Sequence, residues 1–397
     1  MASGTMHGRR GVTYLHFCIS RRDPRRKKRA MSPETASIAR LRAVEVSGDQ
    51  SLVEGPLQGY HHETYVFSLP GGTGTAGPIR CKCREPRTNL LWFDRRCFAS
   101  EEQLLRALAG RIPHVPDIIE VSDLGLQRFI EGRTLGASHA SGRPVPEPFV
   151  RQIIGLFGQL VRVTPQNLSV ERRCATEDQP LDGDTDGFLE RLVCFAEQRV
   201  YLENSKQFGE LFAELGVGEE AFKHLRAYVS GLSSRPFCLL HADLHRENFI
   251  IDAQARLWTI DWELAMFGDP LYDLATHLYL MGYPGRQAST MIEQWCRTVE
   301  AVRPGSANGW HHDLRRLIGF KKAQSVFTDV IRMALSLEAG PTADGHRTAR
   351  VAVKLRRVLA EAVVPLGLDS VPSRNHITTA LERWLRDRMC GPGGAER

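Results

Sequence analysis

Two short segments in the second half of the chain combine carboxylates and an amide at spacings suited to phosphoryl transfer. Residues 241–248 read His-Ala-Asp-Leu-His-Arg-Glu-Asn, which places Asp243 five positions before Asn248. Asp261 follows an apolar run that ends at Ile260. One carboxylate can orient and deprotonate a hydroxyl, while an amide oxygen and a second carboxylate can hold Mg²⁺ against nucleotide phosphates. The pattern predicts a catalytic base at Asp243 and metal ligands at Asn248 and Asp261.

The surrounding sequence predicts how these side chains are positioned. Strand character recurs in four runs, at 65–69, 79–83, 117–121 and 126–130. After about residue 147 helical periodicity dominates, near 148–163, 186–202, 219–232, 287–302, 313–337, 348–363 and 375–389. Two short strands near 248–260 interrupt the helices, and a hairpin there would return Asp261 beside Asn248. We expect a small β-rich lobe, a larger α-helical lobe and an active site in the cleft between them.

Residues 241–275 resemble the corresponding part of a known enzyme family. The first motif, at 241–248, is followed by Ile-Asp-Trp-Glu at 260–263 and by Gly-Asp-Pro-Leu-Tyr-Asp-Leu-Ala at 268–275. This combination resembles the aminoglycoside phosphotransferase family, which belongs with the choline kinases to the protein-kinase-like small-molecule kinases. The resemblance covers about residues 50–340. It implies an α+β, bilobal protein-kinase-like fold.

Two departures separate the chain from ordinary protein kinases. Those enzymes usually carry Lys two residues after the catalytic Asp, where this chain has His245. They also carry Ala-Pro-Glu after an activation segment, whereas this chain continues directly into Asp-Pro-Leu-Tyr-Asp at 269–273. By the resemblance, His245 lies near the transferred phosphate and is a second catalytic residue. Metal binding by His241 and His245 is disfavoured, because the pair lies in a loop and no third ligand suggests itself.

The resemblance also implies nucleotide contacts in the amino-terminal half. Lys82, on the second predicted strand, would reach the α- and β-phosphates, and the alternative is a solvated strand lysine. Glu101 on the following helix would pair with Lys82, with Glu102 as the alternative. Ser100 is the predicted N-cap of that helix, and Gln103 lies at the capping-box spacing.

Two glycine-bearing turns compete for the role of covering the phosphates. Residues 72–77 fit Gly-x-Gly-x-x-Gly, but a strand follows them where a dinucleotide fingerprint requires a helix, so we predict a hairpin tip there. The better candidate is the earlier turn around Gly59. Residues 127–132 resemble the hinge that presents backbone groups to adenine, with Phe129 and Glu131 at its centre. An ordinary strand end is the alternative for that stretch.

Composition excludes several classes of protein. The chain has 397 residues, 42% of them hydrophobic and 25% charged, and no apolar run approaches the roughly 18–20 residues of a membrane helix. The nine cysteines are scattered and include no Cys-x-x-Cys. We therefore predict a reduced, cytoplasmic protein with no membrane partner.

The net charge of +6 is concentrated at the amino terminus. Residues 1–30 carry nine Arg or Lys and one acid, so the other residues together are slightly acidic, at −2. The arm could be a tail for nucleic acid or an anionic surface, a targeting segment, or an extension upstream of a start at Met31. The acidic body predicts no nucleic-acid partner. We assign 1–40 to a basic, disordered extension, 41–135 to a nucleotide-binding lobe, and 136–397 to a helical lobe with the catalytic loop, the metal loop and the acceptor site.

An acidic loop precedes the helix predicted at 186–202. Residues 182–187 begin like a calcium loop, but its twelfth position is Val193 where Glu is required, so calcium binding is not predicted. The carboxylates of this region could instead face a cationic substrate or simply be solvated. They are Glu177, Asp178, Asp182, Asp184 and Asp186.

Together these features predict an O-phosphotransferase that uses ATP, with GTP not excluded, and Mg²⁺ to phosphorylate a hydroxyl of a small molecule. The resemblance makes an aminoglycoside or related antibiotic the leading acceptor, which implies a cationic partner. Choline-like alcohols, sugars and amino-acid alcohols remain alternatives. A regulatory protein that binds nucleotide without turnover is a rival, and the intact set of Asp243, Asn248 and Asp261 argues against it.

Overall fold

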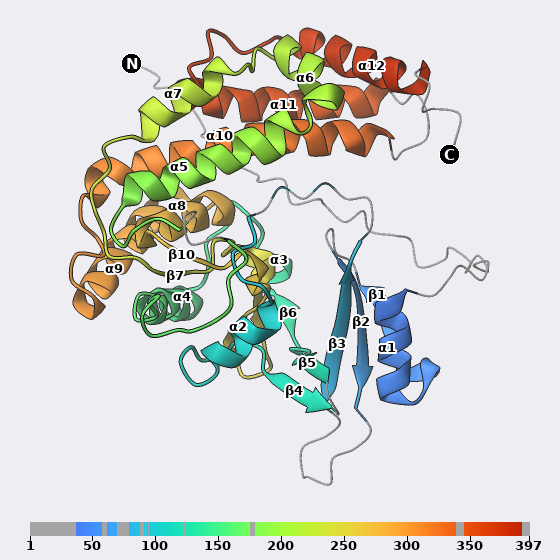
Figure 1. Ribbon diagram of the computed structural model, residues 1–397, viewed down its shortest axis with the longest axis vertical. Coiled ribbons are helices and arrows are strands. Elements are labelled where there is room, and N and C mark those ends of the chain that lie inside the picture. The colour runs from blue at the N-terminus through green and yellow to red at the C-terminus, as the bar shows by residue number, and fades with distance from the viewer. Residues whose placement is uncertain are drawn as a thin grey trace, which may run out of the picture.

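The computed structural model describes residues 37–57, 62–69, 79–87, 91, 93, 95–121, 124–174, 179–338 and 345–390. A small β-rich lobe lies beside a much larger helical lobe (Figure 1). This arrangement confirms the predicted α+β bilobal fold. Gly59 and the 72–77 turn lie outside the described residues, so the predictions made for them stay predictions.

The small lobe is a five-stranded antiparallel sheet. In spatial order its strands are β1 (Glu54–Leu57), β2 (His62–Ser68), β3 (Arg80–Pro86), β5 (Leu124–Arg128) and β4 (Ile118–Val121). Side chains alternate along β3, as in any strand. Cys81 and Cys83 are buried in the core of the small lobe. Lys82 and Arg84 therefore share the opposite face.

A helix that sequence periodicity did not reveal covers this sheet. Helix α1 (Ile38–Ser47) packs on β2 and β3 through Ala39 and Ala43, beside Cys81. Two alanines make too weak an apolar stripe to recognise in sequence. Because α1 begins at Ile38, the assignment of residues up to 40 to a disordered extension is corrected at its last three positions.

Two further sheets lie where the chain enters the large lobe. One has the order β6 (Arg133–Thr134), β8 (Phe249–Ile251), β9 (Leu257–Thr259), and the other pairs β7 (Cys238–Leu240) with β10 (Met266–Gly268). Gly132 connects the small lobe to β6 with φ +150°. A Cβ atom there would lie 2.3 Å from the carbonyl oxygen of Ile251. Only glycine therefore fits the crossing between the lobes.

Most remaining elements are helices. They are α2 (Glu101–Leu108), α3 (Leu135–Ser138), α4 (Glu147–Leu160), α5 (Thr185–Phe195) with the π-helical continuation η3 (Ala196–Leu202), α6 (Ser205–Glu214), α7 (Glu220–Val229), α8 (Pro270–Met281), α9 (Gly285–Val302), α10 (Trp310–Glu338), α11 (Gly345–Leu366) and α12 (Arg374–Cys390); short 3₁₀ turns are η1 (Gln50–Leu52), η4 (Arg246–Asn248) and η5 (Trp262–Leu264). Ser100 caps α2 by accepting the Gln103 amide at 3.3 Å, which confirms the predicted N-cap.

The helical periodicity of the sequence did not predict α6 and α8. Nearly every residue of α8 is buried, so it lacks a polar face.

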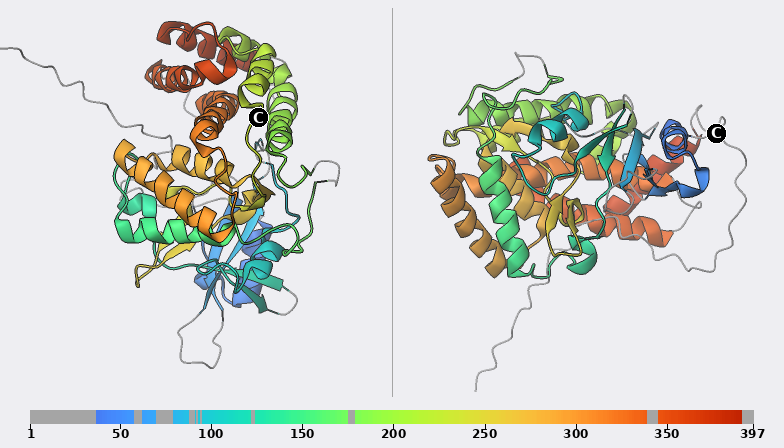
Figure 2. Two further views of the ribbon diagram at one scale, coloured as in Figure 1. Left: turned by 90° about the vertical axis from the view of Figure 1, so that its left-hand side faces the viewer. Right: turned by 90° about the horizontal axis from the view of Figure 1, so that it is seen from below.

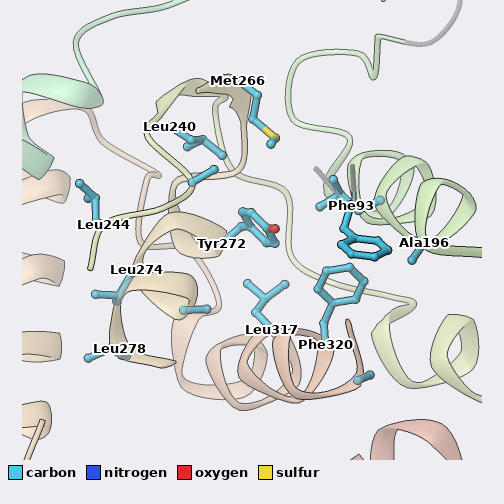
Figure 3. Close-up of a cluster of buried hydrophobic side chains, with 14 of the residues drawn as sticks. Phe93, Ala196, Leu240, Leu244, Met266, Tyr272, Leu274, Leu278, Leu317 and Phe320 are labelled. Atoms are coloured by element: carbon cyan, nitrogen blue, oxygen red, sulfur yellow. The ribbon is translucent and has the colours of Figure 1, made fainter. Parts of the chain in front are cut away.

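The large lobe has its own hydrophobic core, which also holds the apolar side of α2. Leu104, Leu105 and Leu108 belong to this core rather than to the small one. Figure 3 shows Phe93, from the segment before α2, beside Phe320 of α10. The connection from β3 to α2 therefore attaches the small lobe to the large one. In Figure 2, α11 and α12 lie at the end of the molecule opposite the small sheet.

None of the described helices combines the length and apolar character needed to cross a membrane.

Candidate active site

The loop after β7 closes on itself around Asp243. The side-chain Nδ2 of Asn248 donates to the backbone oxygen of Asp243 at 2.9 Å and to its Oδ2 at 3.0 Å. His245 Nε2 lies 3.3 Å from the same Oδ2. The structure thus brings together the predicted base, the predicted phosphate-facing histidine and one predicted metal ligand.

The β8–β9 hairpin carries Asp261 back to this loop. Phe249 pairs with Thr259, and the Ile260 amide donates to the backbone oxygen of Asn248 at 3.0 Å. Asp261 follows with φ +65°, a left-handed conformation that Asp tolerates better than most residues. Its side chain is 39% exposed. The predicted hairpin is therefore present, and Asp261, just after its second strand, has an accessible carboxylate.

The donor atoms at this point suit magnesium. Asn248 uses its nitrogen on Asp243, which leaves its side-chain oxygen as the donor, and Asp261 adds a carboxylate. Mg²⁺ prefers hard oxygen ligands and usually combines one or two protein groups with water and phosphate oxygens. Among the described residues, no group of three or more His, Cys, Asp or Glu is arranged to hold a metal. A metal here would depend on oxygens from a nucleotide.

Buried groups from α8 support the catalytic loop. Asp273 accepts the amides of His241 at 3.1 Å and Ala242 at 2.8 Å. Burial raises the pKa of Asp273 to about 7, against these two hydrogen bonds. His277 Nδ1 lies 2.9 Å from the Leu244 carbonyl oxygen. Asp273 therefore braces the loop that carries Asp243.

Arg246 is a structural residue that sequence reasoning missed. Its guanidinium is buried and donates to three carbonyl oxygens, of Met281 at 2.9 Å, His139 at 2.7 Å and Arg143 at 2.9 Å. These contacts join the catalytic loop to α8 and to the turn after α3. The only signal in the sequence was an arginine inside the 241–248 motif, and its burial could not be read from spacing.

Neighbouring charges shift the pKa values of Asp243 and His245 in opposite directions. Burial acts to raise the pKa of Asp243, but the charge and hydrogen bond of His245 outweigh it, and the pKa lies below its ordinary value. Burial acts to lower the pKa of His245, but Asp243 raises it above its ordinary value. The pair therefore favours an ionised carboxylate beside a protonated imidazole. A carboxylate in that state can accept a proton.

His241 has a structural role, because its ring is buried and hydrogen-bonded to the backbone. It is fully buried, and its Nε2 lies 3.1 Å from the Ile260 carbonyl oxygen. Burial lowers the pKa of His241 to about 4, so the ring is neutral and donates to that oxygen. This contact ties the start of the catalytic loop to the end of the hairpin.

Lys82 lies on the face of β3 opposite the buried cysteines. Burial and, after it, the nearby charge of Arg84 lower the pKa of Lys82 to about 8, against the opposing effect of Asp261 and Glu263. Within the described residues Lys82 forms no ion pair. A phosphate beside this ammonium would stabilise its charged form.

The predicted pair between Lys82 and Glu101 is absent from the described structure, which is a correction. Glu101 pairs with Arg84 and accepts the backbone amide of Trp262 at 2.7 Å. The alternative acid, Glu102, pairs with Arg106 on its own helix. Arg84 shares the face of Lys82 but has a longer, forked head group, and this reaches α2 instead.

Arg84 also reaches the loop that carries the predicted metal ligand Asp261. Its Nη1 lies 3.4 Å from Asp261 Oδ1 and 3.6 Å from Glu263 Oε2. Glu263 in turn lies 2.9 Å from Arg96 and 3.5 Å from His62. Residues two apart on a strand share a face, so Arg84 lies on the same face as Lys82. This spacing was the one signal in the sequence that could have predicted Arg84 near the site.

The predicted hinge lies where the two lobes meet. The Phe129 amide donates to the Arg80 carbonyl oxygen at 2.8 Å, and the Arg80 guanidinium lies over the Phe129 ring. Glu131 pairs with Arg80 at 2.8 Å and is largely exposed. The Glu131 side chain thus forms an ion pair at the surface. An adenine contact from this stretch would have to come from backbone groups.

Three acids at the start of α5 and just before it accept hydrogen bonds from backbone amides. Asp182 accepts the amide just before β7 at 2.6 Å, and Asp184 caps α5. Asp186 accepts the two amides of the 231–232 turn at 2.7 and 2.9 Å. These three acids therefore stabilise the local backbone, and their contact with a cationic substrate stays a prediction. The acids at 177–178 lie outside the described residues.

A model of the phosphotransferase enzyme family, abbreviated APH, matches residues 59–305, more than half of the chain. The chain belongs to this family. It is therefore a small-molecule phosphotransferase with an alcohol group as acceptor. The match includes both segments that carry Asp243, Asn248 and Asp261, as well as β3.

Several solved structures are similar to this phosphotransferase. A choline/ethanolamine kinase family protein from Mesorhizobium loti is 14% identical, with 87% of this chain and 98% of that chain covered and a TM-score of 0.48. The macrolide 2'-phosphotransferase MphH from Brachybacterium faecium is 15% identical, with 82% and 94% covered and a TM-score of 0.45. A thermostable mutant of aminoglycoside phosphotransferase APH(4)-Ia, in a ternary complex with ADP and hygromycin B, is 15% identical, with 87% and 99% covered and a TM-score of 0.43. No curated protein matches the sequence.

Proposed function

We propose that this phosphotransferase moves the γ-phosphate of ATP to a hydroxyl of an aminoglycoside or related antibiotic. The observation that carries the proposal is the closed loop in which Asn248 holds Asp243 through a 3.0 Å hydrogen bond, at the base of the hairpin that presents Asp261. The resemblance of residues 241–275 to the aminoglycoside phosphotransferases supports this acceptor class. GTP stays an alternative nucleotide.

Each residue has a distinct part in the proposed reaction. Asp243 orients the acceptor hydroxyl and accepts its proton as the oxygen attacks the γ-phosphorus in line and the bond to the β-phosphate oxygen breaks. His245, whose pKa Asp243 raises, would face the oxygens of the transferred group. Asn248 and Asp261 would hold Mg²⁺, which neutralises charge on the β- and γ-phosphates. Because the transition state is loose, positioning and electrostatics supply most of the rate enhancement.

The nucleotide would lie between β3 and the hinge. Lys82, which forms no ion pair with the described residues, would present its ammonium to the α- and β-phosphates, and the backbone of residues 130–131 would face adenine. The turn around Gly59 would cover the phosphates. Phosphorylation would disable an antibiotic because the added group carries about −1.5 to −2 charges where the drug presented a neutral hydroxyl.

A second acceptor class is favoured by one observation. Lys321 of α10 helps to lower the pKa of Asp243, so its charge acts at the catalytic carboxylate. Its Nζ also lies 3.3 Å from the hydroxyl of Tyr272. A cation near the catalytic base repels a polycationic acceptor and suits a neutral or anionic alcohol. A metabolic kinase for sugars or amino-acid alcohols is therefore the alternative, with choline-type alcohols less favoured by this charge.

The test is an acceptor screen that detects the mass of one added phosphate, with the wild type and Asp243→Ala compared on any acceptor found. Loss of the base should lower kcat by about 10²–10⁴-fold. Asp369→Ala, which removes an exposed acid far along the chain, is the matched control and should leave kcat unchanged. Near-normal kcat in Asp243→Ala, or no phosphorylated product with any acceptor, would contradict the proposal.

A further inference from the structure

Strand β3 presents two cations on one face, and they have different surroundings. Lys82 forms no ion pair within the described residues, whereas Arg84 pairs with Glu101 and approaches Asp261 and Glu263. Arg84 is only 21% exposed. A guanidinium can contact separate carboxylates through its several N–H groups, which an ammonium on a shorter reach does less well. The two cations are therefore not equivalent.

Glu101 connects Arg84 to the metal loop. One carboxylate oxygen pairs with Arg84, and the other accepts the Trp262 amide at 2.7 Å. The Glu101 side chain is 7% exposed, so both of its partners matter for its stability in this position. Trp262 directly follows Asp261, whose backbone is left-handed at φ +65°. The position of the Glu101 carboxylate thus constrains the backbone that aims Asp261.

We propose that Arg84 is a positioning residue for the metal loop: it holds Glu101 on the Trp262 amide and neutralises the acids around Asp261, which leaves Lys82 for the nucleotide phosphates. Arg84 and Lys82, two residues of one strand, thus have separate roles. The part that concerns Lys82 and the metal rests on the proposed function, whereas the part that concerns Trp262 does not.

The positioning role of Arg84 is clear from what would change in the loop without it. Glu101 would remain as a nearly buried carboxylate without a cation, and burying an unpaired charge is unfavourable. It would move toward solvent and release the Trp262 amide. The side chain of Asp261 would then sample more orientations, and a metal held by it would bind less tightly. Lys82 would keep its place, because β3 itself is unchanged.

The first experiment measures amide hydrogen exchange at Trp262 in the full chain without ligand. Arg84→Gln and Glu101→Gln should each make this amide exchange at least about 10-fold faster, with core amides of α10 unchanged. Lys82→Gln is the matched control on the same strand face and should leave Trp262 exchange as in the wild type. Arg84→Lys, which keeps the charge but not the fork, should give an intermediate rate. Unchanged exchange in a folded Arg84→Gln or Arg84→Lys protein would overturn the proposal.

The second experiment is calorimetric binding of a non-hydrolysable ATP analogue with and without Mg²⁺. Lys82→Gln should weaken binding in both conditions. Arg84→Gln should leave metal-free binding unchanged and reduce the gain from Mg²⁺ by about 10-fold, which is about 1.4 kcal/mol. If Arg84→Gln weakens metal-free binding as Lys82→Gln does, Arg84 is a phosphate ligand and the proposal is wrong. If the wild type binds no nucleotide while the Trp262 result holds, the proposed function fails and the positioning role stands.

Discussion

At the scale of single residues, charge and burial decide what the side chains of the site can do. Asp243 is ionised because His245 outweighs the effect of burial on its pKa. His241 is neutral because burial lowers its pKa to about 4. Lys82 lies between these cases, with a pKa lowered to about 8 mainly by burial. Its charge therefore changes within the range of ordinary assays.

This pKa predicts how nucleotide affinity depends on pH. Anionic phosphates bind the charged ammonium, so affinity should be full below pH 8 and fall above it as free Lys82 loses its proton. Metal-free binding of ATP, measured by calorimetry across this range, checks the sign. Lys82→Arg, whose side chain stays charged, should abolish the dependence near pH 8 even if its affinity is lower. An affinity for the wild type that is flat across pH 8 would rule out Lys82 as the phosphate ligand.

At the scale of elements, the site depends on the short connections between strands. The β8–β9 hairpin places Asp261 beside Asn248, and residues 129–132 join the small sheet to β6. Gly132 is the most constrained point of that crossing, because its backbone has φ +150° and the Ile251 carbonyl oxygen occupies the space of a Cβ atom.

Gly132→Ala should therefore destabilise the protein and weaken the attachment of the lobes. The strained backbone alone should lower the free energy of unfolding by about 1–3 kcal/mol. The close contact with Ile251 should lower it further. Gly142→Ala is the matched control, since Gly142 also has a positive φ, +81°, but no atom lies within 4 Å of the position that a Cβ atom would take there. Urea unfolding measures both free energies. Equal losses in the two variants would show that the close approach to Ile251 contributes nothing.

At the scale of the whole molecule, a buried ion network holds the catalytic loop's supporting helices together. Arg235 is fully buried, donates to both carboxylate oxygens of Asp269 at 2.7–2.9 Å and lies 2.7 Å from Asp313. Asp269 caps α8, and Asp313 lies in the first turn of α10. The network therefore fixes α8, which braces the catalytic loop, against α10.

Removing the shared cation should be costly. Arg235→Met leaves two buried carboxylates without a cation and should lower the free energy of unfolding by about 3–5 kcal/mol. Arg199→Met removes an exposed pair with Glu203 and should cost no more than about 1 kcal/mol. Urea unfolding of the two variants provides the comparison. A loss in Arg235→Met no greater than in Arg199→Met would mean that the network does not stabilise the fold.

The closeness of Asp243, Asn248 and Asp261 could be predicted from sequence because their contacts are local. Asp243 and Asn248 lie in one tight loop, and a short hairpin returns Asp261, so residue types and spacing determine their proximity. Contacts between distant segments were decided by the tertiary structure alone. Glu101 meets Arg84 and Trp262, and Arg246 reaches carbonyl groups more than 100 residues away. Spacing carries no information on such contacts, because they arise from how separately formed elements pack.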